Sequence, residues 1–213
     1  MGERPTVYVI DDDESVRAGL DSLLRSVGYD SHGFASPRAF LAHPPGTGPS
    51  CLVLDIRMPD ASGLDFQDEL AAMGRCIPIV FLTGHGDVPM SVKAMKAGAV
   101  SFLLKPFREQ DLLDAIREAL DRDRARLRQD DQASELRERF ATLTAREREV
   151  MARVVVGRLN KQIAAEIGLS EVTVKVHRGH VMRKMQADTV ADLIRMADRL
   201  GIGAACGSEP GVR

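Results

Sequence analysis

The segment VYVIDDDE, from Val7 to Glu14, joins a short apolar run directly to four consecutive carboxylates. Val7–Ile10 has the apolar character of a buried β-strand. Neighbouring carboxylates repel one another, and burying a charge is costly unless a partner neutralises it. The segment therefore predicts either a positively charged group beside the end of this strand or an acidic run that is fully solvated.

Four more apolar runs follow within the first 120 residues, separated by segments whose apolar residues have helical spacing. The runs lack polar alternation, which is typical of parallel strands covered by helices on both faces. The expected fold class of this region is therefore α/β, with a five-stranded parallel sheet. The predicted strands are 7–10, 29–34, 51–54, 77–82 and 100–104, and the predicted helices are about 16–27, 37–41, 64–73, 88–97 and from 109 onward.

Polar side chains end four of these strands. In parallel sheets the carboxyl ends of the strands form one edge, where ligands bind. Each residue alone is compatible with a chain that simply leaves a strand. Carboxylates, a hydroxyl and an ammonium delivered by four strands to one edge are a less ordinary combination. The residues are Asp11, Asp12, Asp13, Asp55, Thr83 and Lys105.

The chemistry of this edge suits phosphoryl transfer. Carboxylate oxygens are ligands for Mg²⁺ or Mn²⁺, and one carboxylate can act as a nucleophile that forms an aspartyl-phosphate. Lys105 would supply positive charge to the phosphoryl oxygens, and Thr83 would supply a hydrogen bond. The sequence contains no Walker-type glycine-rich loop and no kinase catalytic loop. We therefore expect that the chain does not bind ATP itself.

The motifs VIDDDE, LDIRMPDASG, FLTGHGD and FLLKPF resemble the receiver domain of bacterial two-component response regulators, over about residues 5–120. The resemblance implies a flavodoxin-like fold, with Asp55 as the phosphoacceptor and Asp13 without a required role. It also implies a cis peptide bond before Pro106. The implied metal ligands are Asp12 directly, Asp11 through water, Asp55 and the backbone carbonyl of Arg57; the implied switch and phosphate-binding residues are Thr83, Phe102 and Lys105.

A highly charged segment follows the receiver. Leucines recur every seven residues, but the alternate seam positions are Ile116, Asp123 and Asp130, of which only one is apolar. This pattern favours a solvated helical spacer over a coiled coil, with a hinge at Gln129–Ser134. The predicted divisions are a receiver at 1–121, a helical linker at 122–139, a helix-turn-helix domain at 140–201 and a disordered tail at 202–213.

The last part of the chain is basic. Residues 1–120 contain 11 Lys and Arg against 17 Asp and Glu, whereas residues 141–213 contain 12 against 8. Thr144 and Glu147 form a capping-box pattern, Asn160 is the expected cap of a second helix, and Ser170 starts a third. These short helices predict an all-α four-helix domain containing a helix-turn-helix.

The third helix of this domain, EVTVKVHRGHVMRKM, has two faces at 100° per residue. Val174, His177, Val181 and Met185 are expected in the core. The opposite face carries no acid, which suits the major groove of DNA, although a basic helix can also simply be solvated. His177 and His180 have no second ligand pair in the sequence and do not indicate a metal site. The expected DNA-contacting residues are Lys161, Thr173, Lys175, Val176, Arg178, Gly179 and Arg183.

LTAREREVM and NKQIAAEIGLSEVTVKVHRGHVMRKM resemble the LuxR-type DNA-binding domain over about residues 140–200, which with the receiver indicates the FixJ/NarL subfamily. Gly179 departs from the longer polar or basic residue that several members carry. The resemblance implies a sensor histidine kinase, double-stranded operator DNA and RNA polymerase as partners. It also implies that phosphorylation favours a homodimer through the fourth helix, fifth strand and fifth helix of the receiver.

Two other classes of function remain open from the sequence. One is a Mg²⁺-dependent phosphohydrolase with an aspartyl intermediate; Arg57, two residues after Asp55, stands where that chemistry needs a second carboxylate. The other is a regulator whose helical domain binds protein. Otherwise only self-phosphorylation from a phosphodonor and slow autodephosphorylation are expected, not enzyme activity. No apolar run approaches the roughly 20 residues of a membrane helix, and no signal peptide or CxxC pair is present, which favours a cytoplasmic protein. The resemblance to bacterial DNA-binding regulators further implies a bacterial, nucleoid-associated protein.

Overall fold

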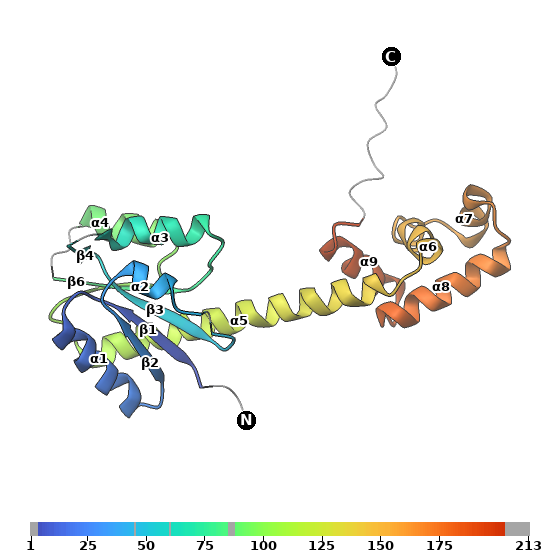
Figure 1. Ribbon diagram of the computed structural model, residues 1–213. Coiled ribbons are helices and arrows are strands. Elements are labelled where there is room, and N and C mark those ends of the chain that lie inside the picture. The colour runs from blue at the N-terminus through green and yellow to red at the C-terminus, as the bar shows by residue number, and fades with distance from the viewer. Residues whose placement is uncertain (1–3, 45, 60, 85–87, 203–213) are drawn as a thin grey trace, which may run out of the picture. The chain divides into compact units, whose positions relative to one another are not determined.

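A computed structural model describes residues 4–44, 46–59, 61–84 and 88–202 (Figure 1). The chain divides into two compact units, one extending to Arg128 and the other beginning at Gln129. Except for residue 202, the tail that was predicted to be disordered lies outside the described residues.

The first unit is built on a five-stranded parallel sheet, as the apolar runs predict, and its strand order is β2-β1-β3-β6-β7. A second, two-stranded antiparallel sheet was not predicted; it pairs β4 (Arg57–Met58) with β5 (Ala61–Ser62). The strands of the main sheet are β1 (Thr6–Ile10), β2 (Asp30–Phe34), β3 (Ser50–Asp55), β6 (Ile79–Thr83) and β7 (Ser101–Leu104).

Helices cover both faces of this sheet, so alternate residues of each central strand enter two separate cores. Val7 and Val9 pack with residues of α1 and α5, whereas Tyr8 and Ile10 pack with residues of α2, α3 and α4. Both layers are visible in Figure 1. The helices are α1 (Glu14–Ser26), α2 (Pro37–Leu41), α3 (Gly63–Ala72), α4 (Val88–Lys96) and α5 (Glu109–Ala141).

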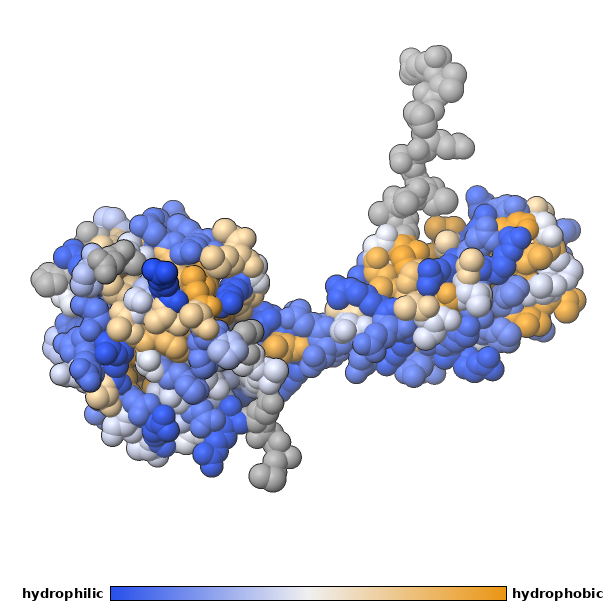
Figure 2. Space-filling view, in the orientation of Figure 1, coloured by the Kyte–Doolittle hydropathy of each residue, from blue (hydrophilic) through white to orange (hydrophobic). Residues whose placement is uncertain are grey.

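The long helix α5 is continuous through Gln129–Ser134, although the division between the two units falls at the start of this stretch, where a hinge is predicted. The stretch contains neither glycine nor proline, and pairs such as Arg139 with Glu135 at i,i+4 support the helix. Its surface is largely hydrophilic (Figure 2). The first unit extends past residue 121 because buried Asp123 accepts a hydrogen bond from the Ser50 backbone N–H at 2.9 Å.

The second unit is the predicted four-helix domain. The end of α5 contributes Leu136 to its core, and the helices also bury Val150, Val174 and Val181. Among the described residues, none of the helices is both long and apolar enough to cross a bilayer. The four helices are α6 (Ala145–Val155), α7 (Asn160–Ile167), α8 (Glu171–Met185) and α9 (Val190–Arg199).

Two of the three helix caps expected in this unit are confirmed. Thr144 and Glu147 form the capping box of α6, and the Ser170 hydroxyl accepts a hydrogen bond from the Thr173 N–H at the start of α8. The prediction for Asn160 is wrong, because Asn160 is the first residue of α7 rather than its cap. Its side-chain oxygen instead accepts a hydrogen bond from Arg178 at 3.1 Å, a long-range contact that helix-end patterns do not contain.

Candidate functional site

The carboxyl edge of the main sheet brings the predicted phosphoryl-transfer residues together. Asp11 follows β1, Asp55 ends β3, Thr83 ends β6 and Lys105 follows β7. The ammonium of Lys105 donates hydrogen bonds to Asp11 Oδ2 at 2.6 Å and to Asp55 Oδ2 at 2.7 Å. Asp11, Asp55 and Thr83 are buried. The sheet topology thus places two carboxylates, a hydroxyl and a cation in one small region.

The charges at this edge compensate one another. Burial raises the pKa of Asp11 from its ordinary value, against the hydrogen bond from Lys105, which lowers it. Burial alone would lower the pKa of Lys105, but the hydrogen bonds to Asp11 and Asp55 outweigh it and the pKa is raised. Lys105 is therefore a stable cation, and it is the positive group that the acidic run requires.

The residues of the acidic run lie in different environments. Asp11 is buried, whereas Asp12 and Asp13 are exposed. Asp13 caps α1, because its Oδ1 accepts a hydrogen bond from the Ser15 N–H at 2.8 Å. Glu14 occupies the first turn, where a negative charge is favourable. Helix capping is thus a role of Asp13 that the motif comparison did not indicate.

Asp11, Asp12 and Asp55 each place a carboxylate oxygen within 4.8 Å of the others. Three hard oxygen ligands, two from buried residues, fit the coordination chemistry of Mg²⁺ or Mn²⁺. Arg57 lies beside them, and its backbone N–H donates to Asp55 Oδ1 at 3.0 Å. The role of its carbonyl as a ligand stays a prediction.

The two predicted switch residues lie on neighbouring strands. Thr83 is fully buried, and its backbone carbonyl accepts a hydrogen bond from the Lys105 N–H at 2.8 Å. Phe102 is half-buried on β7, with its ring centroid 6.5 Å from that of Phe81. The peptide bond between Lys105 and Pro106 is cis, as predicted.

Two residues that support the site were not identified from the sequence. Arg17 donates hydrogen bonds to the backbone carbonyls of Asp11 at 2.8 Å and Asp12 at 2.9 Å, which holds the acidic loop in place. Gly63 lies against the end of β3, where an added Cβ would be only 2.4 Å from the Asp55 carbonyl oxygen. The glycine of the DASG motif was the available signal, but its close neighbour is defined only by the tertiary fold.

Some of the expected DNA-contacting residues are exposed, whereas others are half-buried against side chains of the same unit. Thr173 is half-buried and its hydroxyl lies 2.8 Å from that of Ser170, and Arg178 is half-buried against Asn160. The apolar side chain of Val176 is 51% exposed, which suits contact with a thymine methyl. The exposed members are Lys161, Lys175, Val176, Gly179 and Arg183.

Known families match both units. Residues 7–117 match the response regulator receiver domain, and residues 141–197 match the bacterial regulatory proteins of the luxR family. The chain is 54% identical over 198 residues to nodulation protein W of Bradyrhizobium diazoefficiens, covering 93% of this chain and 87% of that protein. It is 48% identical to the response regulator protein TodT of Pseudomonas putida, covering 94% and 88%.

Solved structures agree with these sequence matches. The structure of the response regulator StyR has a TM-score of 0.82 and 47% identity, covering 92% of this chain and all of that one. Full-length FixJ from B. japonicum has a TM-score of 0.56 and 40% identity, covering 94% and 98%. With both domains matched and relatives similar over nearly their whole length, the chain belongs to the two-component response regulators that carry a LuxR-type DNA-binding domain, close to FixJ, TodT and nodulation protein W.

Proposed function

We propose that this response regulator is a transcription factor switched by phosphorylation of Asp55. The observation that carries the proposal is the contact of Lys105 with both Asp11 and Asp55. This contact holds the buried carboxylate of Asp55 next to a fixed cation at a sheet edge, which is the arrangement that a phosphoryl acceptor requires. A sensor histidine kinase would be the donor.

In the proposed transfer, an oxygen of Asp55 attacks the phosphorus of a phosphohistidine, and the phosphorus–nitrogen bond breaks. The Arg57 N–H holds Oδ1 of Asp55, and Lys105 holds Oδ2, so the carboxylate has a fixed orientation. Lys105 then balances the added phosphoryl charge. Bound Mg²⁺ or Mn²⁺, held by Asp11, Asp12, Asp55 and the Arg57 carbonyl, would supply further positive charge to the phosphoryl oxygens.

Phosphorylation would change the surface of the first unit through Thr83 and Phe102, which lie on neighbouring strands. The Thr83 hydroxyl would hydrogen bond to the phosphoryl group, and Phe102 would turn inward. Both changes alter the surface formed by α4, β7 and α5, where we place the homodimer contact. Four large apolar side chains exposed on α4 and β7 support this placement, namely Val88, Val92, Met95 and Leu104, each exposed by 44% or more.

In a dimer, the second unit of each chain would bind one operator half-site in cytoplasmic DNA, and the dimer would act on RNA polymerase. We propose that Lys175 and Val176 contact bases, and that Lys161 and Arg183 contact phosphates. Thr173 and Arg178 would position α8, and Gly179 would let its backbone approach the DNA closely. In this assignment the chain consists, in order, of a receiver, a helical linker and a helix-turn-helix domain.

The phosphohydrolase alternative gains no support from the site. Arg57, rather than a carboxylate, stands two residues after Asp55, and its side chain is exposed. The described residues around Asp55 thus offer no second acid in that position. Slow hydrolysis of the aspartyl-phosphate is still expected.

The decisive experiment is sedimentation of the full chain with Mg²⁺, with and without beryllofluoride, on wild type and Asp55→Asn. We expect a monomer-to-dimer shift in wild type alone, together with tighter and salt-dependent binding to operator DNA. A dimer that forms equally in Asp55→Asn would contradict the assignment of Asp55. DNA binding that does not depend on salt would instead favour a protein partner for the second unit.

A further inference from the structure

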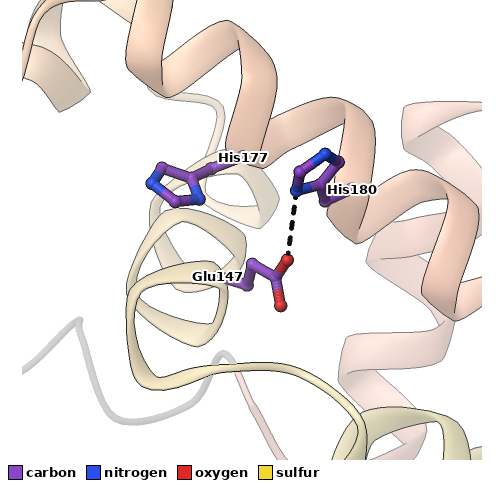
Figure 3. Close-up of side chains that lie close together, drawn as sticks. All are labelled: Glu147, His177 and His180. Carbon is purple, nitrogen blue, oxygen red and sulfur yellow. Dashed lines mark ion pairs between the residues drawn. The ribbon is translucent and has the colours of Figure 1, made fainter.

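Glu147, His177 and His180 come together in the second unit, outside the residues that the proposed function uses. Glu147 belongs to α6, and both histidines belong to α8, one turn apart. Each offers one ligand atom, and these atoms lie within 4.8 Å of one another. Figure 3 shows the two imidazole rings and the carboxylate on facing sides of the two helices.

The two oxygens of Glu147 have different neighbours. Oε2 accepts hydrogen bonds from the Lys184 ammonium at 2.7 Å and from the Thr144 N–H at 2.8 Å. Oε1 instead faces Nδ1 of His180 at 3.4 Å, which is long for a hydrogen bond between nitrogen and oxygen. Oε1 is thus directed at an imidazole without the close contact that a hydrogen bond would give.

His177 carries a second sign of an incomplete site. Its Nδ1 is shielded from solvent and has no hydrogen-bond partner within the described ranges. Buried polar atoms are nearly always paired with protein, water or an ion, so this nitrogen is available to a ligand that enters the site. His180, by contrast, is 42% exposed, so an ion could enter from solvent beside it.

We propose that Glu147 Oε1, His177 and His180 bind a divalent transition-metal ion of the Zn²⁺ class. Zn²⁺ accepts histidine nitrogen and carboxylate oxygen at about 2.1 Å, so two ligands of a tetrahedral ion lie about 3.4 Å apart. The His180–Glu147 separation already has this value. Rotation of the His177 side chain would bring the third ligand to the ion, with the fourth position open to water.

The ion would tie the helix that carries the DNA-contacting residues to α6. Binding to the folded unit alone would stabilise that unit by mass action. The Lys184 ammonium on the same carboxylate would oppose the ion by like-charge repulsion and weaken its affinity. The site is separate from the Asp55 edge, so Asp55→Asn should bind the ion as wild type does.

Zinc titration of the full, untagged chain by calorimetry, in excess Mg²⁺, tests this proposal with His180→Asn as the principal variant. We expect wild type to bind one Zn²⁺ at this site. The affinity of His180→Asn for this ion should be lower by a factor of about ten or more. The matched control is the double variant His32→Asn/His43→Asn. Those two rings lie 5.2 Å apart in the first unit and form the other described histidine pair, and their loss should leave this binding event intact.

Two further measurements keep the result decisive. Co²⁺ bound to wild type should give the intense visible absorption of a tetrahedral site. This measurement needs no variant, so it does not depend on whether a variant folds. Lys184→Gln should bind Zn²⁺ more tightly than wild type, because the opposing charge is gone. Equal Zn²⁺ affinity in wild type and His180→Asn, or no tetrahedral Co²⁺ spectrum, would overturn the proposal.

Discussion

The ammonium of Lys105 lies 2.7 Å from the carboxylate of Asp55, fifty residues earlier in the chain. The same ammonium lies 2.6 Å from Asp11. One cation therefore serves two buried carboxylates, and its removal would leave like charges together without a counter-ion. This contact connects the stability of the first unit with the charge of its proposed phosphoryl site.

Lys105→Gln should lower the free energy of unfolding of the first unit by about 1–3 kcal/mol in the absence of divalent ions. Mg²⁺ should restore more stability to this variant than to wild type, because a dication replaces the missing charge. Urea unfolding with and without Mg²⁺ measures both effects. Lys93→Gln is the control, since the pair of Lys93 with Asp65 is exposed and its atoms lie 4.0 Å apart. Equal losses in the two variants would argue against this account.

Gly63→Ala should destabilise the first unit by about 1–3 kcal/mol, because the new Cβ would press on the Asp55 carbonyl oxygen. Acetyl phosphate should then label a smaller fraction of the chain, which intact mass spectrometry measures. Gly33→Ala is the control, since the three atoms nearest its added Cβ belong to the Arg17 side chain and lie at ordinary contact distance, 3.6 Å or more. Normal labelling of Gly63→Ala would show that the close approach is unimportant.

Gly179→Ala should stabilise the second unit by about 1 kcal/mol and yet weaken binding to operator DNA. No described atom lies within 4 Å of the added Cβ, so nothing inside the unit requires glycine here. Thermal unfolding and fluorescence anisotropy measure the two effects. Gly19→Ala in α1, which also adds a Cβ in open space, should give a similar gain in stability and unchanged DNA affinity. Unchanged DNA affinity in Gly179→Ala would dispose of the close-approach hypothesis.

Lys175→Ala and Lys161→Ala should weaken DNA binding in different ways. Loss of a base contact at Lys175 should cost about 1–3 kcal/mol of discrimination between operator and altered sequences. Loss of a phosphate contact at Lys161 should weaken binding to all sequences and reduce the slope of log affinity against log salt by about 0.9. Titrations at several salt concentrations distinguish the two, and identical behaviour of both variants would refute the assignment.

Asp192→Asn should reduce the stability of the second unit at neutral pH. Hydrogen bonds from the Thr189 hydroxyl and N–H hold the pKa of Asp192 below its ordinary 3.8. A lowered pKa in the folded state means that the stabilisation is present above pH 3.8 and is lost as the pH falls through the folded value. The difference in unfolding temperature between wild type and variant should therefore disappear in acid. A constant difference at every pH would exclude this cause.

The fold and the main site were largely predictable from local patterns. Apolar runs without alternation indicated a parallel sheet, and the confirmed topology then required Asp11, Asp55 and Lys105 to meet at one edge. The capping box at Thr144 was equally predictable, because it involves residues three positions apart. These features depend on periodicity and on the shared direction of parallel strands, both of which are present in the order of residues.

Contacts between distant segments were decided by the tertiary structure alone. Asp123 appeared as a charged interruption of a helix, yet it is buried against Ser50, and Asn160 holds Arg178 instead of capping a helix. His177 and His180 had no recognisable partner until α6 placed Glu147 beside them. Helical and strand periodicity determine which face of an element is buried, but which side chain lies opposite depends on how the elements pack.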